Sequence, residues 1–364
     1  MTTTRPDAAE LAALREAVGD LVDSCGGTAA ARRRLDAAPG FDERAWRLLG
    51  KDMGLAGLGI PEQIGGSGGG LAELTTVAEE LGRALLPVPF LSSTVLAGQV
   101  LARCGSSDVL TRLVAGTVVA FVGTDPDGCW RPDAVAVVAD DAGRLTGTVA
   151  FVLDGGQAEQ LLVAAHTADG CDLFVLDADA EGVGRRSLET LDPSRSQAEI
   201  TFGNVSGHRL TSDGQAAALV SAALDVALVV LAAEQVGGAA ACLDAAVEYA
   251  KIRHQFSRPI GSFQAIKHKL ADLLLLVEMG RSAIDRAIVV KDDPTALAEA
   301  AALAKAWCSE AYTGVATENV HINGGTGFTW EHDAHLYFRR AKSDEVLLGG
   351  PSVHRERLAQ LLAW

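Results

Sequence analysis

The chain has 364 residues, of which 48% are hydrophobic and 21% charged, a composition typical of a folded protein rather than a disordered one. Its formal net charge of −16 disfavours binding to nucleic acid or to anionic membranes, since both carry negative charge. The six cysteines form no CxxC motif and show no metal-ligand spacing. Together with an N-terminus that lacks a signal pattern, this predicts reduced thiols in a cytoplasmic protein without a metal site.

Residues 1–115 have a helical pattern, in which apolar residues recur every three or four positions. We expect helices at Ala8–Cys25, Glu43–Met53, Leu71–Leu86 and Ser92–Cys104. This segment is predicted to be an N-terminal helical domain.

Residues 116–210 have a different pattern of short valine-rich runs separated by turn residues such as Asp154-Gly-Gly and Asp169-Gly. We expect strands at Thr117–Gly123, Ala134–Ala139, Leu145–Val152, Gln160–Ala165, Asp172–Leu176 and Ala198–Phe202. These runs do not alternate with helices, so a doubly wound dinucleotide fold is disfavoured. The pattern predicts a middle antiparallel β-barrel or sandwich.

Residues 211–364 return to long alanine- and leucine-rich helical segments at about 214–250, 262–291 and 294–319. The stretch Ala216–Ala233 is apolar enough to raise the question of a membrane span. It contains Ser221 and Asp225 and is followed by Glu234, so we interpret it as a helix buried in a bundle. The fold class is therefore α+β, with helices, then strands, then a helical bundle.

Two segments of the last region carry uncommon patterns. The first, Tyr249–Asp272, contains Arg253-His-Gln-Phe256 and then Pro-Ile, Phe-Gln and Leu-Ala-Asp. The second begins at His321 and reads His-Ile-Asn-Gly-Gly-Thr-Gly-Phe. Both resemble motifs of the acyl-CoA dehydrogenase family, whose order of helices, sheet and helices also matches, and the resemblance extends over essentially the whole chain. It implies an N-terminal helical domain, a middle β domain and a C-terminal four-helix bundle.

The resemblance also implies FAD as the cofactor and acyl-CoA as the substrate. In the family, the two motifs hold the ADP half of the FAD that belongs to the neighbouring subunit. An arginine offers a planar fork of donors to a pyrophosphate, and glycines let the backbone approach a ligand closely. Carried over by position, the FAD contacts would be Arg253, Gln255, Phe256, Gln264, His321, Gly324 and Gly325. His321 departs from the glutamine that is usual in the family.

Each of these residues also has an interpretation without a ligand. Arg253 is equally consistent with a surface charge at a helix end, and Phe256 with a core side chain. Gly324 and Gly325 fit a helix end followed by a turn.

The carboxylate that abstracts a proton in this family is missing from its usual place. Counting forward from Phe338-Arg-Arg-Ala-Lys puts Leu348 at that position, and counting back from Arg253 to the alternative position used by some members puts Ala227 there. Neither side chain can act as a base. Glu234 and Glu345 lie near these positions and are the candidates for a relocated base.

The segment that covers the flavin ring in the family is also altered. It reads Phe151-Val-Leu153-Asp-Gly155 instead of Trp-Ile-Thr-Asn-Gly, so Leu153 replaces a hydroxyl that would bond to the flavin edge. The segment Thr124-Asp-Pro-Asp-Gly128 lacks the serine that follows in the family. The half that binds ADP is thus retained, while the half that binds the ring and the substrate is degraded.

This combination resembles the actinobacterial heteromeric dehydrogenase subunits of steroid side-chain β-oxidation. It implies a subunit that shares its active site with a related, base-bearing partner, in an α2β2 assembly with an electron-transfer flavoprotein as acceptor. A steroid CoA ester is the leading substrate. Three alternatives stay open at this point: a self-sufficient dehydrogenase with a relocated base, an enzyme acting on acyl-carrier protein, and a flavin-binding or scaffolding subunit without catalysis.

Overall fold

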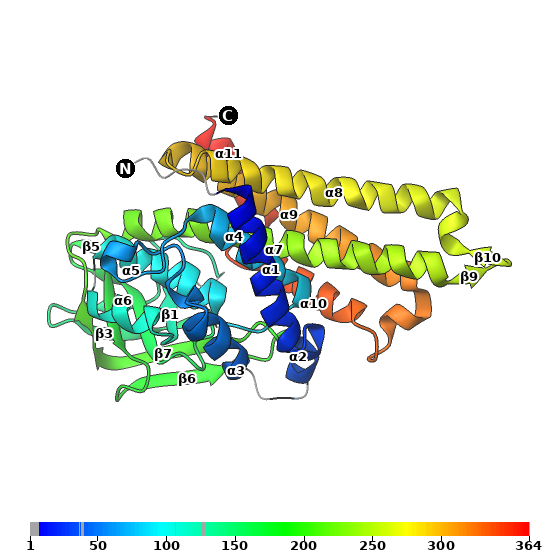
Figure 1. Ribbon diagram of the computed structural model, residues 1–364. Coiled ribbons are helices and arrows are strands. Elements are labelled where there is room, and N and C mark those ends of the chain that lie inside the picture. Colours follow the sequence, from blue (N-terminus) through cyan, green and yellow to red (C-terminus); the bar gives the residue numbers. More distant parts are fainter. Residues whose placement is uncertain (1–6, 36, 38–39, 106, 126–127, 364) are drawn as a thin grey trace.

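The computed structural model describes residues 7–363, except 36, 38–39, 106 and 126–127. Two residues of the Asp-Pro-Asp-Gly turn at 125–128 therefore lie outside the described part. Figure 1 shows N-terminal helices and a curled sheet at one side, with long helices extending away from them. The α+β fold class with a C-terminal helical bundle is confirmed.

The N-terminal segment folds into helices at each of the four predicted places. Two of these helices contain a π-helical part, Arg47–Asp52 after α3 and Phe90–Ala97 before α5. The short helices α2 and α6 were not predicted. The α-helical bounds are α1 Ala8–Ser24, α2 Thr28–Arg34, α3 Glu43–Trp46, α4 Leu71–Ala84, α5 Gly98–Cys104 and α6 Ser107–Val114.

The middle segment forms an eight-stranded sheet in the order β6-β7-β3-β2-β4-β5-β8, with β1 also paired to β4. The strands are β1 Val119–Val122, β2 Val138–Ala139, β3 Arg144–Leu153, β4 Gln160–Thr167, β5 Gly170–Asp177, β6 Val183–Ser187, β7 Gln197–Ser206 and β8 His208–Arg209. Strands β6 and β8 were not predicted, and the expected strand at 134–139 shrinks to two residues.

The prediction of a purely antiparallel sheet was wrong in one respect. Both β1 and β2 pair with β4 in parallel, whereas all other described pairs in this sheet are antiparallel. A parallel pair requires a crossover connection. Alternation of residues within a strand carries no information about strand direction, so the sequence pattern could not reveal it.

The C-terminal segment consists of α7 Ala216–Ile252, α8 Gln264–Val289, α9 Pro294–Asn323, α10 Ala334–Val346 and α11 Pro351–Leu361. Helices α7, α8, α9 and α10 form the predicted bundle, and α11 packs on α9. By length and composition α7 could cross a membrane, but 72% of its most apolar window is buried against other parts of the protein. Its apolar character is explained by this central position in the core.

Glycines allow α4 of the N-terminal segment to cross α7 closely. A Cβ atom at Gly82 would lie 2.1 Å from the Glu234 carbonyl oxygen, and one at Gly237 would lie 2.0 Å from that of Glu79. Side chains at either position would force the helices apart. One continuous hydrophobic core runs through all three segments, and the limits 1–115, 116–210 and 211–364 stay predictions as domain boundaries.

Candidate functional site

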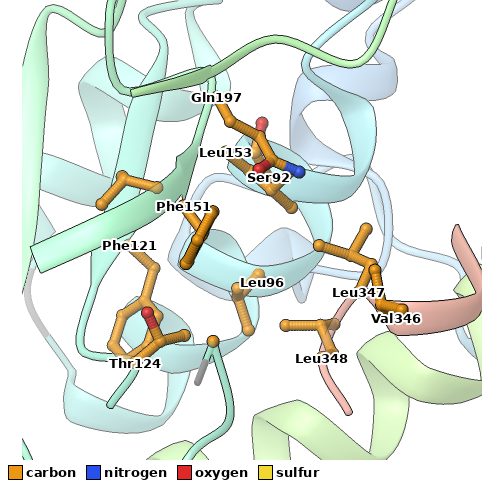
Figure 2. Close-up of a pocket in the computed structure, with 12 residues that line it drawn as sticks. Ser92, Leu96, Phe121, Thr124, Phe151, Leu153, Gln197, Val346, Leu347 and Leu348 are labelled. Carbon is orange, nitrogen blue, oxygen red and sulfur yellow. The ribbon is translucent and has the colours of Figure 1, made fainter. Parts of the chain in front are cut away.

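A cavity of about 130 Å³ lies between the π-helical segment before α5, strands β3 and β7, and the chain that follows α10 (Figure 2). Most of its walls are aliphatic or aromatic, and none of the described lining residues is a carboxylate. The residues that line it are Ser92, Leu96, Phe121, Thr124, Gly128, Phe151, Val152, Leu153, Gln197, Val346, Leu347 and Leu348.

The two positions where the resemblance places a base are both aliphatic in the structure. Leu348 lines the cavity and is buried, with a left-handed backbone (φ +57°). Ala227 is fully buried within α7 and does not line the cavity. The wall that Leu348 contributes therefore has no group that can take up a proton.

Phe151 enters this cavity from a bulge in β3. The register between β3 and β7 shifts between Val149 and Val152, and Phe151 adopts φ +60°, which is uncommon for a bulky side chain. Bulges of this kind re-aim a side chain away from the regular pleat. Phe151 and Leu153 both line the cavity, as Figure 2 shows, so the altered segment does form one of its walls.

Glu234 lies in a buried ion network rather than in the cavity wall. Arg340 Nη1 donates to Glu234 Oε1 at 2.7 Å, and Arg195 donates to the same oxygen. Arg195 also donates to Asp344 Oδ1 at 3.1 Å, while Arg340 Nε donates to Asp192 Oδ2 at 2.5 Å. Two guanidinium groups thus hold the Glu234 carboxylate, and its position suits a structural anion. Burial raises the pKa of Asp344 in this network to about 7.

Glu345, the other candidate base, is also engaged by neighbours. Its carboxylate accepts a hydrogen bond from Thr313 Oγ1 at 3.0 Å and one from Lys342. It is not among the lining residues, although the three residues that follow it are. The structure therefore places neither candidate carboxylate in the cavity.

Two polar residues that line the cavity, Ser92 and Gln197, were missed by the sequence argument. Ser92 Oγ donates to Asp154 Oδ2 at 2.5 Å, and Ser92 lines the cavity together with Gln197. Burial raises the pKa of Asp154 to about 6. Asp154 falls within the altered segment. Its partner Ser92 lies 62 positions away, so no local sequence pattern could predict the pair.

The residues predicted to contact FAD gather at the far end of the bundle from the sheet (Figure 1). Helix α7 ends at Ile252, the short hairpin of β9 His254–Gln255 and β10 Arg258–Pro259 follows, and α8 starts at Gln264. Helix α9 then returns along the bundle and ends at Asn323. This up-and-down path brings the two motifs to the same end.

The side chains of the hairpin are turned to solvent. Phe256 is 88% exposed, which overturns its interpretation as a core residue, and Arg253, Gln255 and Gln264 are also exposed. Arg253 makes no ion pair within the part of the chain that the structure describes. An exposed guanidinium without an ion pair among the described residues suits a phosphate ligand.

The second motif presents open backbone. Gly324 ends α9 with φ +61°, and a Cβ atom built at Gly324 or Gly325 would meet no atom within 4 Å. His321, on the last turn of α9, is exposed with Nδ1 3.5 Å from Glu318 Oε1. The surface beside these glycines is therefore free for a ligand or a partner chain to approach.

Comparison with known proteins identifies the family of this chain. The family's N-terminal domain matches residues 8–118, and the acyl-CoA dehydrogenase C-terminal domain matches residues 215–363. The chain is a member of the acyl-CoA dehydrogenase family, FAD-dependent oxidoreductases that act on CH–CH bonds.

The similar proteins include one whose name refers to a steroid enzyme and one that is named as a complex. Acyl-CoA dehydrogenase IpdE2 of Mycobacterium tuberculosis is 37% identical over 96% of this chain and 95% of its own length. A variant of the Tcur3481-Tcur3483 steroid ACAD is 32% identical, with a TM-score of 0.87 and 98% of each chain covered. The ChsE4-ChsE5 complex from Mycobacterium tuberculosis is 31% identical, with a TM-score of 0.86, 100% of this chain covered and 99% of the other.

The residues at the two sites fit FAD unequally. The donors and open glycines at the bundle end fit the pyrophosphate and ADP portion. The cavity of about 130 Å³ is open on one side and lined mostly by apolar side chains, so it offers few polar side chains to the edge of a flavin ring.

Proposed function

We propose that this chain is one subunit of a heteromeric FAD-dependent acyl-CoA dehydrogenase, in which a related partner subunit supplies the base. The observation that carries the proposal is Leu348, an aliphatic residue in the cavity wall where the family places its glutamate. The surface formed by the β9–β10 hairpin and by Gly324 and Gly325, at the other end of the bundle, supplies the contacts to the ADP portion of FAD.

The reaction is α,β-dehydrogenation of an acyl-CoA thioester. A base removes a proton from the α-carbon, and FAD, when bound, accepts the hydride that leaves the β-carbon. In this proposal Arg253, Gln255, Phe256 and Gln264 hold the ADP portion of the cofactor, together with His321, Gly324 and Gly325. The proton goes to a carboxylate of the partner.

An α2β2 assembly with one FAD per heterodimer is the arrangement we propose. Apolar side chains exposed at the bundle end support it, since large exposed apolar groups mark interaction sites. Ile252, Phe256 and Phe328 are each more than 60% exposed. The named complexes among the similar structures support it further.

We also propose a steroid side-chain CoA ester as the substrate, because a steroid enzyme is among the similar structures. An electron-transfer flavoprotein is the acceptor in this scheme, and the site of action is the cytoplasm. Cys25, Cys104, Cys171, Cys242 and Cys308 form no disulfide within the described part of the chain, which supports a reducing compartment.

The first test is the visible flavin spectrum of the chain purified alone and with a dehydrogenase paralogue. Flavin and acyl-CoA oxidation are expected only in the copurified complex. A yellow, active lone chain would refute the shared site and return attention to Glu234 and Glu345 as bases.

The second test is Arg253→Ala in that complex. One charge-assisted contact to the pyrophosphate is lost, so FAD affinity should fall about tenfold or more while the subunits remain together. Arg286→Ala, an exposed arginine further along α8, is the matched control and should keep FAD. Full flavin content and turnover in Arg253→Ala would instead indicate a scaffolding subunit.

A further inference from the structure

The β9–β10 hairpin, which extends from the end of the bundle in Figure 1, carries a second arginine besides Arg253. This residue is Arg258, the first of β10, and it is not among the FAD contacts proposed above. Gln255 and Arg258 pair directly across the two strands, so their side chains leave the same face of the hairpin. Arg253 lies two residues before Gln255 in extended backbone and shares that face. Its carbonyl accepts from the Ile260 N–H at 2.8 Å, which continues the strand pairing to this point.

Arg258 is restrained by an aromatic ring rather than by a carboxylate. Its guanidinium carbon lies 3.9 Å from the centre of the Phe263 ring, and Phe263 makes an edge contact with Phe256 at 6.2 Å between ring centres. A guanidinium over a ring face is held in place while its N–H donors remain free at the edge. Arg258 is exposed and makes no ion pair within the part of the chain that the structure describes. Restraint before binding lowers the entropy that is lost when a ligand binds.

The charge of the hairpin and its flanks is opposite to that of the whole chain. From Tyr249 to Ala271 the sequence has no aspartate or glutamate but five lysines and arginines, although the formal net charge of the chain is −16. Two of these, Lys251 and Lys269, are paired with glutamates from outside the segment. The two hairpin arginines have no such partner among the described residues. They are therefore available to an anionic ligand.

We propose that Arg253 and Arg258 form a two-guanidinium site for a pyrophosphate, in which Arg258 makes the site prefer a diphosphate to a monophosphate. The inference rests on the proposed function, in which this end of the bundle holds the ADP portion of FAD, and it adds a residue that determines specificity. Each phosphate of a pyrophosphate carries negative charge, and each guanidinium offers a planar fork of donors to one of them. A ligand with a single phosphate loses one of these two pairings.

Binding of ADP and AMP to the copurified complex, after removal of its FAD, tests this assignment by titration calorimetry. Arg258→Gln should weaken ADP binding about tenfold, because one charge-assisted pairing is lost, and should weaken AMP binding clearly less. The preference for ADP over AMP should therefore fall. General damage to the fold would weaken both nucleotides equally, so an unchanged preference in Arg258→Gln would overturn the inference.

Two further variants test how Arg258 acts. Arg258→Lys keeps the charge but lacks the planar fork, so it should recover only part of the preference for ADP. Phe263→Leu keeps the arginine but removes the ring beneath it, so the preference should fall about threefold. Arg286→Gln, an exposed arginine towards the other end of α8, is the matched control and should bind both nucleotides as the native complex does.

Comparison with Arg253→Ala separates this inference from the function on which it rests. If Arg253→Ala loses ADP binding while Arg258→Gln binds as the native complex does, the inference is overturned and the proposed function stands. If neither variant weakens ADP binding, both are refuted. If Arg258→Gln separates the subunits but keeps the preference for ADP, the residue contacts the partner chain instead, and the inference is likewise overturned.

Discussion

Lys305 is a fully buried lysine that holds the end of α10 in place. Its Nζ donates to Ser309 Oγ at 2.8 Å and to the carbonyl oxygens of Asp344 and Glu345 at 2.9 and 3.1 Å. These carbonyls directly precede the residues that line the cavity. A buried cation therefore anchors one wall of the site, at the cost of its own desolvation.

This desolvation predicts how stability depends on pH. Burial lowers the pKa of Lys305 from 10.5 to about 8, so between these values the unfolded chain binds more protons than the folded one. The lysine's contribution should be constant below about pH 8 and should become more favourable as pH rises towards 10.5. In urea unfolding, the native chain should gain about 2 kcal/mol over Lys305→Met between pH 7.5 and 9.5. A stability difference that does not change with pH would contradict this, and the exposed Lys267→Met serves as the control.

Glu234 and Glu345 should differ in their effect on stability. Glu234→Gln removes the charge that two buried guanidinium groups share, so it should destabilise the fold by about 3 kcal/mol. Glu345→Gln removes a partly exposed pair with Lys342 and should cost less than about 1 kcal/mol. Chemical denaturation measures both. A fully stable Glu234→Gln protein with lost turnover would identify a catalytic carboxylate instead.

At the scale of elements, the β9–β10 hairpin has an unusual turn. Gln255 pairs with Arg258, leaving a two-residue loop in which Phe256 and Ser257 adopt φ +51° and +66°. Two-residue hairpin turns with positive φ at both positions favour Asn-Gly, because bulkier residues are strained there. The hairpin therefore places Phe256, a proposed FAD contact, at a strained position of its turn.

Relief of this strain at the neighbouring residue should be measurable. Ser257→Gly should stabilise the chain by roughly 0.5–1 kcal/mol, since glycine adopts positive φ without steric cost. Ser282→Gly, in the middle of α8, should have the opposite sign because glycine weakens a helix interior. Thermal unfolding compares the two, and a loss of stability in Ser257→Gly would show that the turn is not strained.

At the scale of the molecule, the cavity and the residues proposed to contact FAD lie far apart. The cavity lies beside the sheet. The β9–β10 hairpin lies at the opposite end of the long helices, as Figure 1 shows. In the proposed arrangement one FAD contacts the two ends on different subunits, so the complete site includes a second subunit. Native mass spectrometry of the copurified complex should show two copies of each subunit and two FAD molecules. Four FAD molecules, or a homo-oligomer that binds FAD, would contradict the shared-site arrangement.

Much of the fold follows from local patterns along the chain. The period of apolar residues located α4, α7, α8 and α9, because each buries one or more faces with helical spacing. The strands β3, β4 and β5 were located by their valine-rich runs. Short elements such as β6 and the parallel pairing of β1 with β4 were not, since they depend on contacts with distant strands.

The candidate site was likewise predictable from the sequence only in part. The identities of Leu348 and Ala227 exclude a base at the usual places, because side-chain chemistry is a property of the sequence alone. Their burial, the ion network around Glu234 and the pairing of Ser92 with Asp154 required the tertiary structure. These groups lie far apart in the sequence, and burial then decides their partners and their pKa values, since desolvation depends on every element packed around them.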